Sequence, residues 1–260
     1  MSRATDVAET FATFLRRGLA AGLVGGTASA LALWWLGEPS IRDSLQIEAR
    51  LSQGEAHEET FSREVQVLGG VTAVLITGIV LGLVLTIVFV KVRNRVELPT
   101  DAHVAVATGS LLFLVHGLIP WLKYPPNPPG VGDPETINER TVAYLALIAL
   151  AACALVLAHE VTLRLARRRV ELAWRWFAAV AVTVVVIAIS YLVLPAADPI
   201  PAGIGAQLLW RFRLASLGGL AVMWGGMTVT MAVLCSGRGK APQRPHSPGT
   251  WRNAQPRSTD

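Results

Sequence analysis

The sequence predicts an all-α protein, a polytopic transmembrane helix bundle with about six spans and both chain ends in the cytoplasm. Three observations predict this fold class: the composition, the apolar stretches and the distribution of basic residues. Hydrophobic residues make up 52% of the 260 residues and charged residues only 16%, and the mean hydropathy is +0.48. A soluble domain carries about 25% charged residues, and a disordered chain requires low hydrophobicity. The composition therefore excludes an ordinary soluble enzyme and a mostly disordered chain.

Apolar residues gather in six stretches, each near or above the length of about 20 residues that a helix needs to cross a bilayer. A helix is expected for each stretch, because it satisfies its own backbone hydrogen bonds in lipid. The first stretch continues to Trp34 and Trp35, beyond the usual core of a signal peptide, so we expect it to be retained. The six stretches are Gly18–Leu36, Val65–Val90, Ala102–Leu122, Thr141–Ala158, Trp176–Leu194 and Gln207–Cys235.

Basic residues indicate the orientation of these spans. With the N-terminus inside, 16 of the 23 Lys and Arg residues fall in inner segments and 5 in outer loops, while Arg211 and Arg213 lie within the last span. Such a bias places both termini in the cytoplasm. The pI near 9.8 then follows from topology, and no nucleic-acid partner is expected.

Acidic residues show the opposite distribution. The outer loops hold 11 of the 18 Asp and Glu residues, so with their 5 basic residues they carry a net charge of −6. A negative mouth raises the local concentration of cations. Solubility alone is the alternative reason for this excess.

The chain divides into a cytoplasmic N-terminal segment (1–17), a membrane domain (18–235) and a tail (236–260). The tail is rich in Pro, Gly, Ser and Arg, which is typical of disorder. Two outer loops stand out in the membrane domain, an acidic one over 37–64 and a proline-rich one over 123–139.

The acidic outer loop contains a short cluster of possible metal ligands. Its sequence Glu55-Ala56-His57-Glu58-Glu59 combines one imidazole with three carboxylates. These ligand types suit divalent transition metals. A solvated run of charges is the alternative interpretation.

The proline-rich outer loop holds five of the 15 prolines. Proline fixes φ and keeps the chain extended, so we expect a stiff segment that presents polar groups at the mouth of the bundle. A simple rigid hairpin between two spans is the alternative. The polar candidates here are Lys123, Tyr124, Asn127, Asp133 and Glu135.

His116 lies about 6 residues, or about 9 Å of helix rise, inside the outer end of the third span. Pro120 follows four positions later and is expected to loosen the helical hydrogen bonds at His116. An ionisable residue within a span is a functional candidate, and imidazole is a common metal ligand. The alternative is a hydrogen bond to a neighbouring helix.

Arg211 and Arg213 enter the last span near its outer end. Because they are two positions apart, a helix directs them to different faces. They either snorkel to the interface or one of them pairs with Asp133, Glu135 or Asp198.

Other residues carry little functional signal. Cys153 and Cys235 lie in apolar runs, and we expect both to be small buried side chains. His103 and His159 could hold a haem between them, but histidine is ordinary at span ends. The sequence has no Walker A, HExxH or GxSxG motif, so we expect neither an enzyme nor a permanently bound cofactor.

Several motifs resemble the CbtA family, which is described as a probable cobalt transporter subunit. The resemblance covers roughly residues 14–235. The matching motifs are Gly37-Glu38-Pro39, Ser62-Arg63-Glu64-Val65-Gln66, His116-Gly117-Leu118-Ile119-Pro120, Lys123-Tyr124-Pro125 with Asp133-Pro134-Glu135-Thr136-Ile137, Arg140-Thr141 with Tyr144, and Leu208–Gly218.

The resemblance implies a multi-pass protein of the cell inner membrane, linked to uptake of cobalt(II) for cobalamin synthesis. It also implies a small membrane partner, CbtB, and a homo-oligomer is another way to complete a pore. The metal candidates are then His116, Asp133, Glu135 and His57. The chain departs from the family in having six spans where five are often described, and in keeping only His57 in its first outer loop.

Two other functions remain open. A non-transporting membrane scaffold or assembly factor would use the glycine-rich helices and the stiff loop as structural parts. An integral membrane enzyme could hold a lipid phosphate with Arg211, Arg213 and Lys123 and use His116 as base, although no nucleophile motif supports it.

Overall fold

The computed structural model describes residues 2–51, 62–96, 98–129, 131, 136–197 and 205–236. Six helices in this part of the chain are long and apolar enough to cross a membrane, which confirms the predicted all-α class and the number of spans. The helices are α1 (Ser2–Leu36), α2 (Glu38–Leu51), α3 (Arg63–Val92), α4 (Asp101–Phe113), the π-helix η1 (Leu114–Leu118), α5 (Ile119–Lys123), α6 (Ile137–Arg167), α7 (Leu172–Val193) and α8 (Ala206–Cys235).

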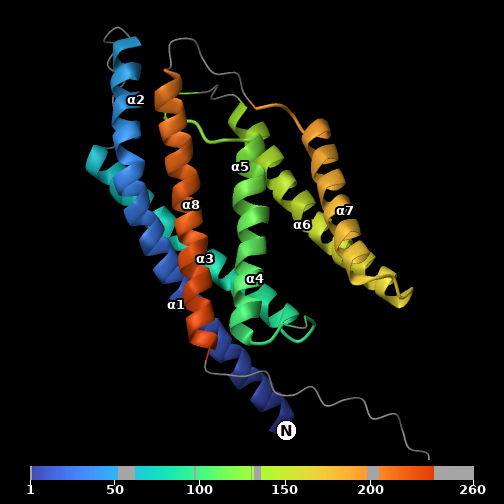
Figure 1. The fold of residues 1–260 in the computed structure, drawn as a ribbon. Coiled ribbons are helices and arrows are strands. Elements are labelled where there is room, and N and C mark those ends of the chain that lie inside the picture. Colours follow the sequence, from blue (N-terminus) through green and yellow to red (C-terminus); the bar gives the residue numbers. More distant parts are fainter. Residues whose placement is uncertain are drawn as a thin grey trace, which may run out of the picture.

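The spans run alternately up and down, so the bundle has two ends (Figure 1). α4, η1 and α5 together form the third span, Asp101–Lys123. We call the end that holds Phe11, Asp101 and Cys235 the N-terminal end. The other end, which holds Lys123 and Ile137, is the proline-rich end.

α1 lies between α3 and α8, and α8 also packs on α4. α6 and α7 form a hairpin that meets the other helices mainly through η1 and α5, near the proline-rich end (Figure 1). These helices share one hydrophobic core, which extends toward the N-terminal end. Phe14, Phe89, Trp224 and Met231 are among the side chains that are buried together in it.

Glycine allows α1 and α3 to approach closely. A Cβ atom at Gly22 would lie 2.5 Å from the Gly78 carbonyl oxygen and 2.8 Å from the Ile79 Cα. Small residues at such spacing let helix backbones meet in membranes. The glycines therefore let the backbones of α1 and α3 come into contact.

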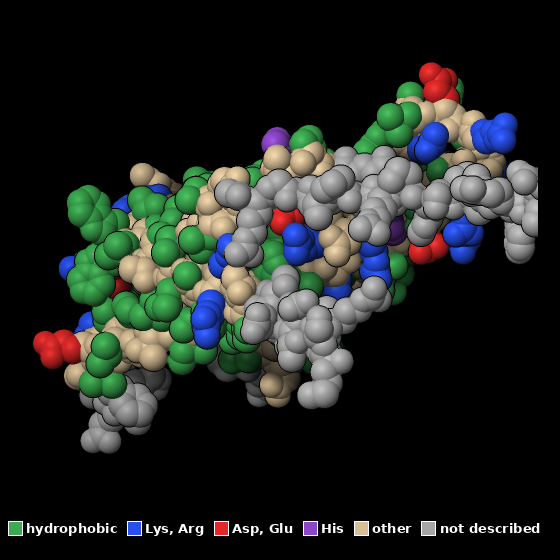
Figure 2. All heavy atoms as spheres, turned by 90° about the horizontal axis from the view of Figure 1, so that it is seen from below, with side chains coloured by type: hydrophobic (Ala, Val, Ile, Leu, Met, Phe, Trp, Pro, Cys, Tyr) green, Lys and Arg blue, Asp and Glu red, His purple; other side chains and the backbone are tan. Residues whose placement is uncertain are grey.

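Large apolar side chains cover the outside of the bundle, as expected for a surface that faces lipid. α7 is the most exposed span, with only 11% of its apolar window buried. Exposed tryptophans lie at both ends, Trp34 and Trp35 at the proline-rich end and Trp174 and Trp176 at the N-terminal end, where aromatic belts meet headgroups. Seen from the N-terminal end, Lys and Arg side chains lie among this hydrophobic surface (Figure 2).

The helices differ from the apolar stretches in two respects. Several extend past them, because charged residues also continue a helix: α1 includes Arg16, which is exposed, and Arg17, which is partly buried. Part of the predicted acidic loop is also helical: α2 follows α1 directly, with Pro39 in its first turn, where proline is tolerated.

Cys153 corrects one prediction. It is exposed on α6, whereas Cys235 is buried as expected. In a membrane helix, an apolar run does not distinguish the face toward lipid from the face toward protein. The predicted tail lies outside the described residues, apart from Ser236.

Candidate functional site at the proline-rich end

His116 lies in η1, the π-helical turn between α4 and α5. Pro120 explains this turn, because proline has no N–H to donate to the carbonyl four residues earlier, which is that of His116. The freed carbonyl accepts a hydrogen bond from the Tyr144 hydroxyl at 3.2 Å. The predicted loosening at His116 is thus confirmed, and a side chain from α6 satisfies the backbone as the membrane interior requires.

The His116 ring contacts Trp224 of α8. The ring centroids are 5.8 Å apart, and Trp224 Nε1 donates to His116 Nδ1 at 3.4 Å. An indole N–H only donates, so Nδ1 is the acceptor and the proton of a neutral ring sits on Nε2. In this arrangement neither ring nitrogen offers a free lone pair to a metal.

Lys123 and two tyrosines connect α5 to the end of α7. Lys123 Nζ donates to the Tyr191 carbonyl at 2.8 Å, and the Tyr191 hydroxyl donates to the Ile119 carbonyl at 2.6 Å. The Tyr124 hydroxyl donates to the Pro195 carbonyl at 2.7 Å. Burial, with a smaller effect from the Glu139 carboxylate, raises the pKa of Tyr124, so its hydroxyl stays a proton donor.

Arg211 and Arg213 point in different directions, as their spacing predicts. Arg211 Nη1 lies 3.4 Å from Asp43 Oδ2 of α2, and Arg213 Nη2 donates to Asn127 Oδ1 at 2.9 Å. The partners expected for these arginines were Asp133, Glu135 and Asp198, all of which lie outside the described residues. The observed partner of Arg211 comes from α2, whereas that of Arg213 is an amide in the proline-rich loop.

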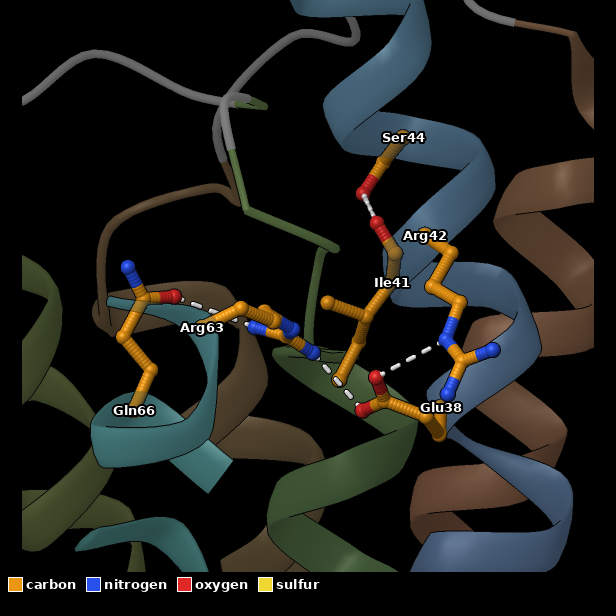
Figure 3. A network of polar contacts seen from close by, with 6 residues as sticks. All are labelled: Glu38, Ile41, Arg42, Ser44, Arg63 and Gln66. Carbon is orange, nitrogen blue, oxygen red and sulfur yellow. Dashed lines mark hydrogen bonds and ion pairs between the residues drawn. The ribbon is translucent and has the colours of Figure 1, made fainter. Parts of the chain in front are cut away.

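Glu38 binds two arginines at the junction of α1, α2 and α3 (Figure 3). Its carboxylate is 2.7 Å from Arg63 Nη2 and 3.1 Å from Arg42 Nε. Burial alone would raise the pKa of Glu38, but hydrogen bonds and charge from Arg63 and Arg42 outweigh burial and lower the pKa. The group is therefore charged at neutral pH, and its charge is matched locally, like that of Asp43.

The described residues contain no group of three or more His, Cys, Asp or Glu side chains that could hold a metal ion. Of the predicted ligands, the structure places only His116, since His57, Asp133 and Glu135 lie outside the described residues. Lys123, Tyr124, Asn127 and Arg213 are described and lie around the end of α5.

Sequence reasoning missed a second polar cluster, at the N-terminal end. Asp101 is 1% exposed and accepts from Arg93 Nη2 at 2.7 Å. The Arg93 guanidinium lies 4.6 Å from the centroid of the Phe14 ring, and Arg17 Nη1 donates to Cys235 Sγ at 3.5 Å. Asp101 opens its helix in the sequence like any first-turn carboxylate, so no local signal indicated that it is buried.

The sequence also did not indicate Trp224 or Tyr191 as partners of the site. Both lie in apolar runs far along the chain from His116 and Ile119. The sequence analysis named Tyr144 only as part of a motif that resembles a family, and not as a partner of His116.

The family model described as "Probable cobalt transporter subunit (CbtA)" matches residues 11–236, nearly all of the described chain. No curated protein and no solved structure matches.

Proposed function

The chain belongs to the CbtA family, and from this premise we propose that it is a permease subunit for uptake of a divalent transition-metal cation. Cobalt(II) is the proposed substrate, and cobalamin synthesis is the proposed use. The family match over residues 11–236 is the observation that carries this proposal, and the six candidate spans support it.

We place the protein in the cell inner membrane with its N-terminal end toward the cytoplasm. The described segments at that end carry many arginines, among them Arg95, Arg164, Arg167 and Arg168, as the positive-inside rule requires. Residues 1–17 and the tail 236–260 would then be cytoplasmic, and the loops over 37–64 and 123–139 would face outward.

His116 is the proposed ligand within the membrane. Cobalt(II) binds the lone pair of an imidazole nitrogen, so the ring has to release Nδ1 from Trp224 or move its proton from Nε2 to Nδ1. Either change breaks the hydrogen bond from Trp224, so this bond opposes the binding of a metal by the His116 ring. Asp133, Glu135 and His57 are proposed as further ligands on the outer side, with Lys123, Tyr124, Asn127, Arg211 and Arg213 around them.

The test is cobalt uptake by cells that lack their own cobalt importer, with the chain and its small CbtB-like partner expressed together. We expect His116→Ala to lower uptake by about tenfold or more. Trp224→Phe, which removes the N–H but keeps an aromatic ring, is expected to retain uptake.

The matched control is His103→Ala, because His103 is exposed at the N-terminal end. It should leave uptake unchanged, with equal amounts of each variant in the membrane. Equal uptake by His116→Ala and the unsubstituted protein would remove His116 from the mechanism. No uptake by the unsubstituted protein with its partner would overturn the proposed transport.

A non-transporting scaffold or assembly factor is the second candidate, favoured by the lack of a three-ligand metal group among the described residues. Purified protein in liposomes distinguishes the two. Cobalt flux with the partner or from a homo-oligomer supports the permease, whereas no flux and no cobalt binding supports the scaffold.

A further inference from the structure

A cavity of about 300 Å³ lies between α1, α3 and α8 near the proline-rich end, next to the start of α2. Apolar side chains make up most of its wall. They include Ala30, Leu33, Val67, Val71, Val74 and Phe212. A second cavity, of about 530 Å³, adjoins it and shares Trp34, Glu38, Arg63, Val67 and Val71 with it. We call the two cavities together the α1–α3 groove.

The groove opens on the outside of the bundle. Trp34 is 53% exposed and Leu68 is 67% exposed, and both line the second cavity. Both also lie in candidate membrane spans, so the opening faces lipid. Gly70 lines the first cavity, and a Cβ atom there would have nothing within 4 Å. The missing side chain at this position therefore leaves space in the wall of the groove.

The groove is about as deep as one leaflet of a bilayer. Its wall follows α3 from Arg63 to Val74, which is about 16 Å along the helix axis. One leaflet contributes half of a hydrocarbon core that is about 30 Å thick. An acyl chain that starts at the level of Arg63 can therefore follow the groove through its own leaflet.

The charged side chains of the described lining lie at one end of the groove, where α2 and α3 begin. They are Glu38, Arg42, Arg63 and Glu64. Glu38 binds both arginines (Figure 3). The Arg42 side chain is 66% exposed, and within the described structure only its Nε is bonded. Its two terminal nitrogens can therefore donate to a phosphate.

Glu64 supplies the opposite charge at the same end. It is exposed and lines the second cavity together with Arg42. Two arginines and two carboxylates leave this end of the groove without net charge. Such a lining matches a head group that carries both a phosphate and an ammonium group, since each finds a partner of opposite sign.

We propose that the α1–α3 groove binds one phospholipid with a zwitterionic head group, such as phosphatidylethanolamine. One acyl chain lies along α3 beside Gly70, the phosphate accepts hydrogen bonds from Arg42, and the ammonium group lies near Glu64. This goes beyond the proposed transport, because none of the described residues that line the groove is a proposed metal ligand.

The test uses the purified full chain, equilibrated with equal amounts of phosphatidylethanolamine and phosphatidylglycerol, and native mass spectrometry of the lipids that it retains. We expect the unsubstituted protein to retain one phosphatidylethanolamine. Gly70→Leu fills the groove and should weaken this binding by about tenfold or more, since losing the burial of about two methylene groups already has that effect.

Gly69→Leu is the matched control for Gly70→Leu. Gly69 is the preceding residue of the same helix, it is also exposed, and a Cβ atom there also has nothing within 4 Å. It does not line either cavity of the groove, so this variant should retain the lipid. Equal unfolding temperatures of the two variants establish that both are folded.

Two further variants test the head group. Arg42→Gln should weaken retention of phosphatidylethanolamine by about two- to fivefold, because the acyl chain keeps its place but the phosphate loses a partner. Arg16→Gln, which changes an exposed arginine at the N-terminal end, should have no effect. Glu64→Gln should remove the preference for phosphatidylethanolamine over phosphatidylglycerol.

The proposal is overturned if the unsubstituted protein retains no phospholipid, or if Gly70→Leu retains as much as Gly69→Leu. It is also overturned if the unsubstituted protein is a dimer that Gly70→Leu alone dissociates, because a second copy then occupies the groove. Equal retention of the two lipids by the unsubstituted protein would overturn the zwitterionic head group.

Discussion

Asp101 is a carboxylate almost without access to solvent. Its side chain pairs with Arg93 at 2.7 Å, and its second oxygen, Oδ1, is buried without a hydrogen-bond partner in the described structure. The guanidinium groups of Arg93 and Arg17 lie over the Phe14 ring, at 4.6 Å and 5.3 Å from its centroid. These residues and Cys235 connect α1, α3, α4 and α8 at the N-terminal end.

Asp101→Asn should destabilise the protein strongly, because it leaves the Arg93 charge partly buried without its counter-charge. Removing one partner of a buried pair costs about 3–5 kcal/mol. The measurement is the free energy of unfolding in mixed micelles of increasing denaturing detergent. Adding Arg93→Met to Asp101→Asn should restore part of the loss.

The matched control for this prediction is Asp43→Asn. The side chains of Asp43 and Arg211 are 49% and 52% exposed, so losing this pair should cost less than about 1 kcal/mol. Equal effects of the two substitutions would contradict the structural role of Asp101.

At the scale of elements, the crossing of α1 and α3 depends on backbone contact. Gly18, Gly22 and Gly26 of α1 face Gly78 and Gly82 of α3, and a Cβ at any of the five would meet the opposite helix. By contrast, a Cβ at Gly70, also on α3, would have nothing within 4 Å. The same helix therefore carries glycines with and without a packing role.

Gly22→Ala should lower stability by about 1–3 kcal/mol, because its methyl group forces the helices apart. Gly70→Ala should be neutral or slightly stabilising, since alanine favours a helix over glycine by up to about 1 kcal/mol. Thermal unfolding of the two purified variants measures the difference. If Gly22→Ala unfolds at the same temperature as Gly70→Ala, the close crossing is wrong.

At the scale of the whole molecule, an even number of spans brings the start of α1 and the end of α8 to the same end (Figure 1). Arginines gather around the turn between α6 and α7 at this end. The orientation proposed above follows from this asymmetry and can be tested directly.

Labelling of single-cysteine variants in intact cells tests the orientation. With Cys153 and Cys235 replaced by serine, we expect an impermeant maleimide to label Ser62→Cys at the proline-rich end. Arg168→Cys, at the turn between α6 and α7, should be labelled only after the cells are opened. The reverse pattern would invert the topology and remove the proposed outer entrance for the metal.

Local rules were sufficient for much of the fold. Hydropathy predicted six spans because each helix must be apolar over the thickness of the bilayer, whatever its neighbours are. Pro120 predicted the irregular turn at His116, because a missing N–H acts on the same helix. The helical part of the acidic loop was missed, since α2 has no long apolar run to identify it.

Which side chains meet was decided by tertiary structure. Three pairs of residues that are in contact lie far apart in the sequence: His116 and Trp224, Arg213 and Asn127, and Arg17 and Cys235. Hydropathy does not reveal such pairs, because it does not distinguish one face of a membrane helix from another. Cys153 and Cys235 lie in similar apolar runs, yet one faces outward and the other is enclosed. The length and composition of a segment are enough to predict that it spans a bilayer. Which side chains contact each other depends on how the helices cross and rotate. That geometry is set by many weak packing contacts between remote parts of the chain.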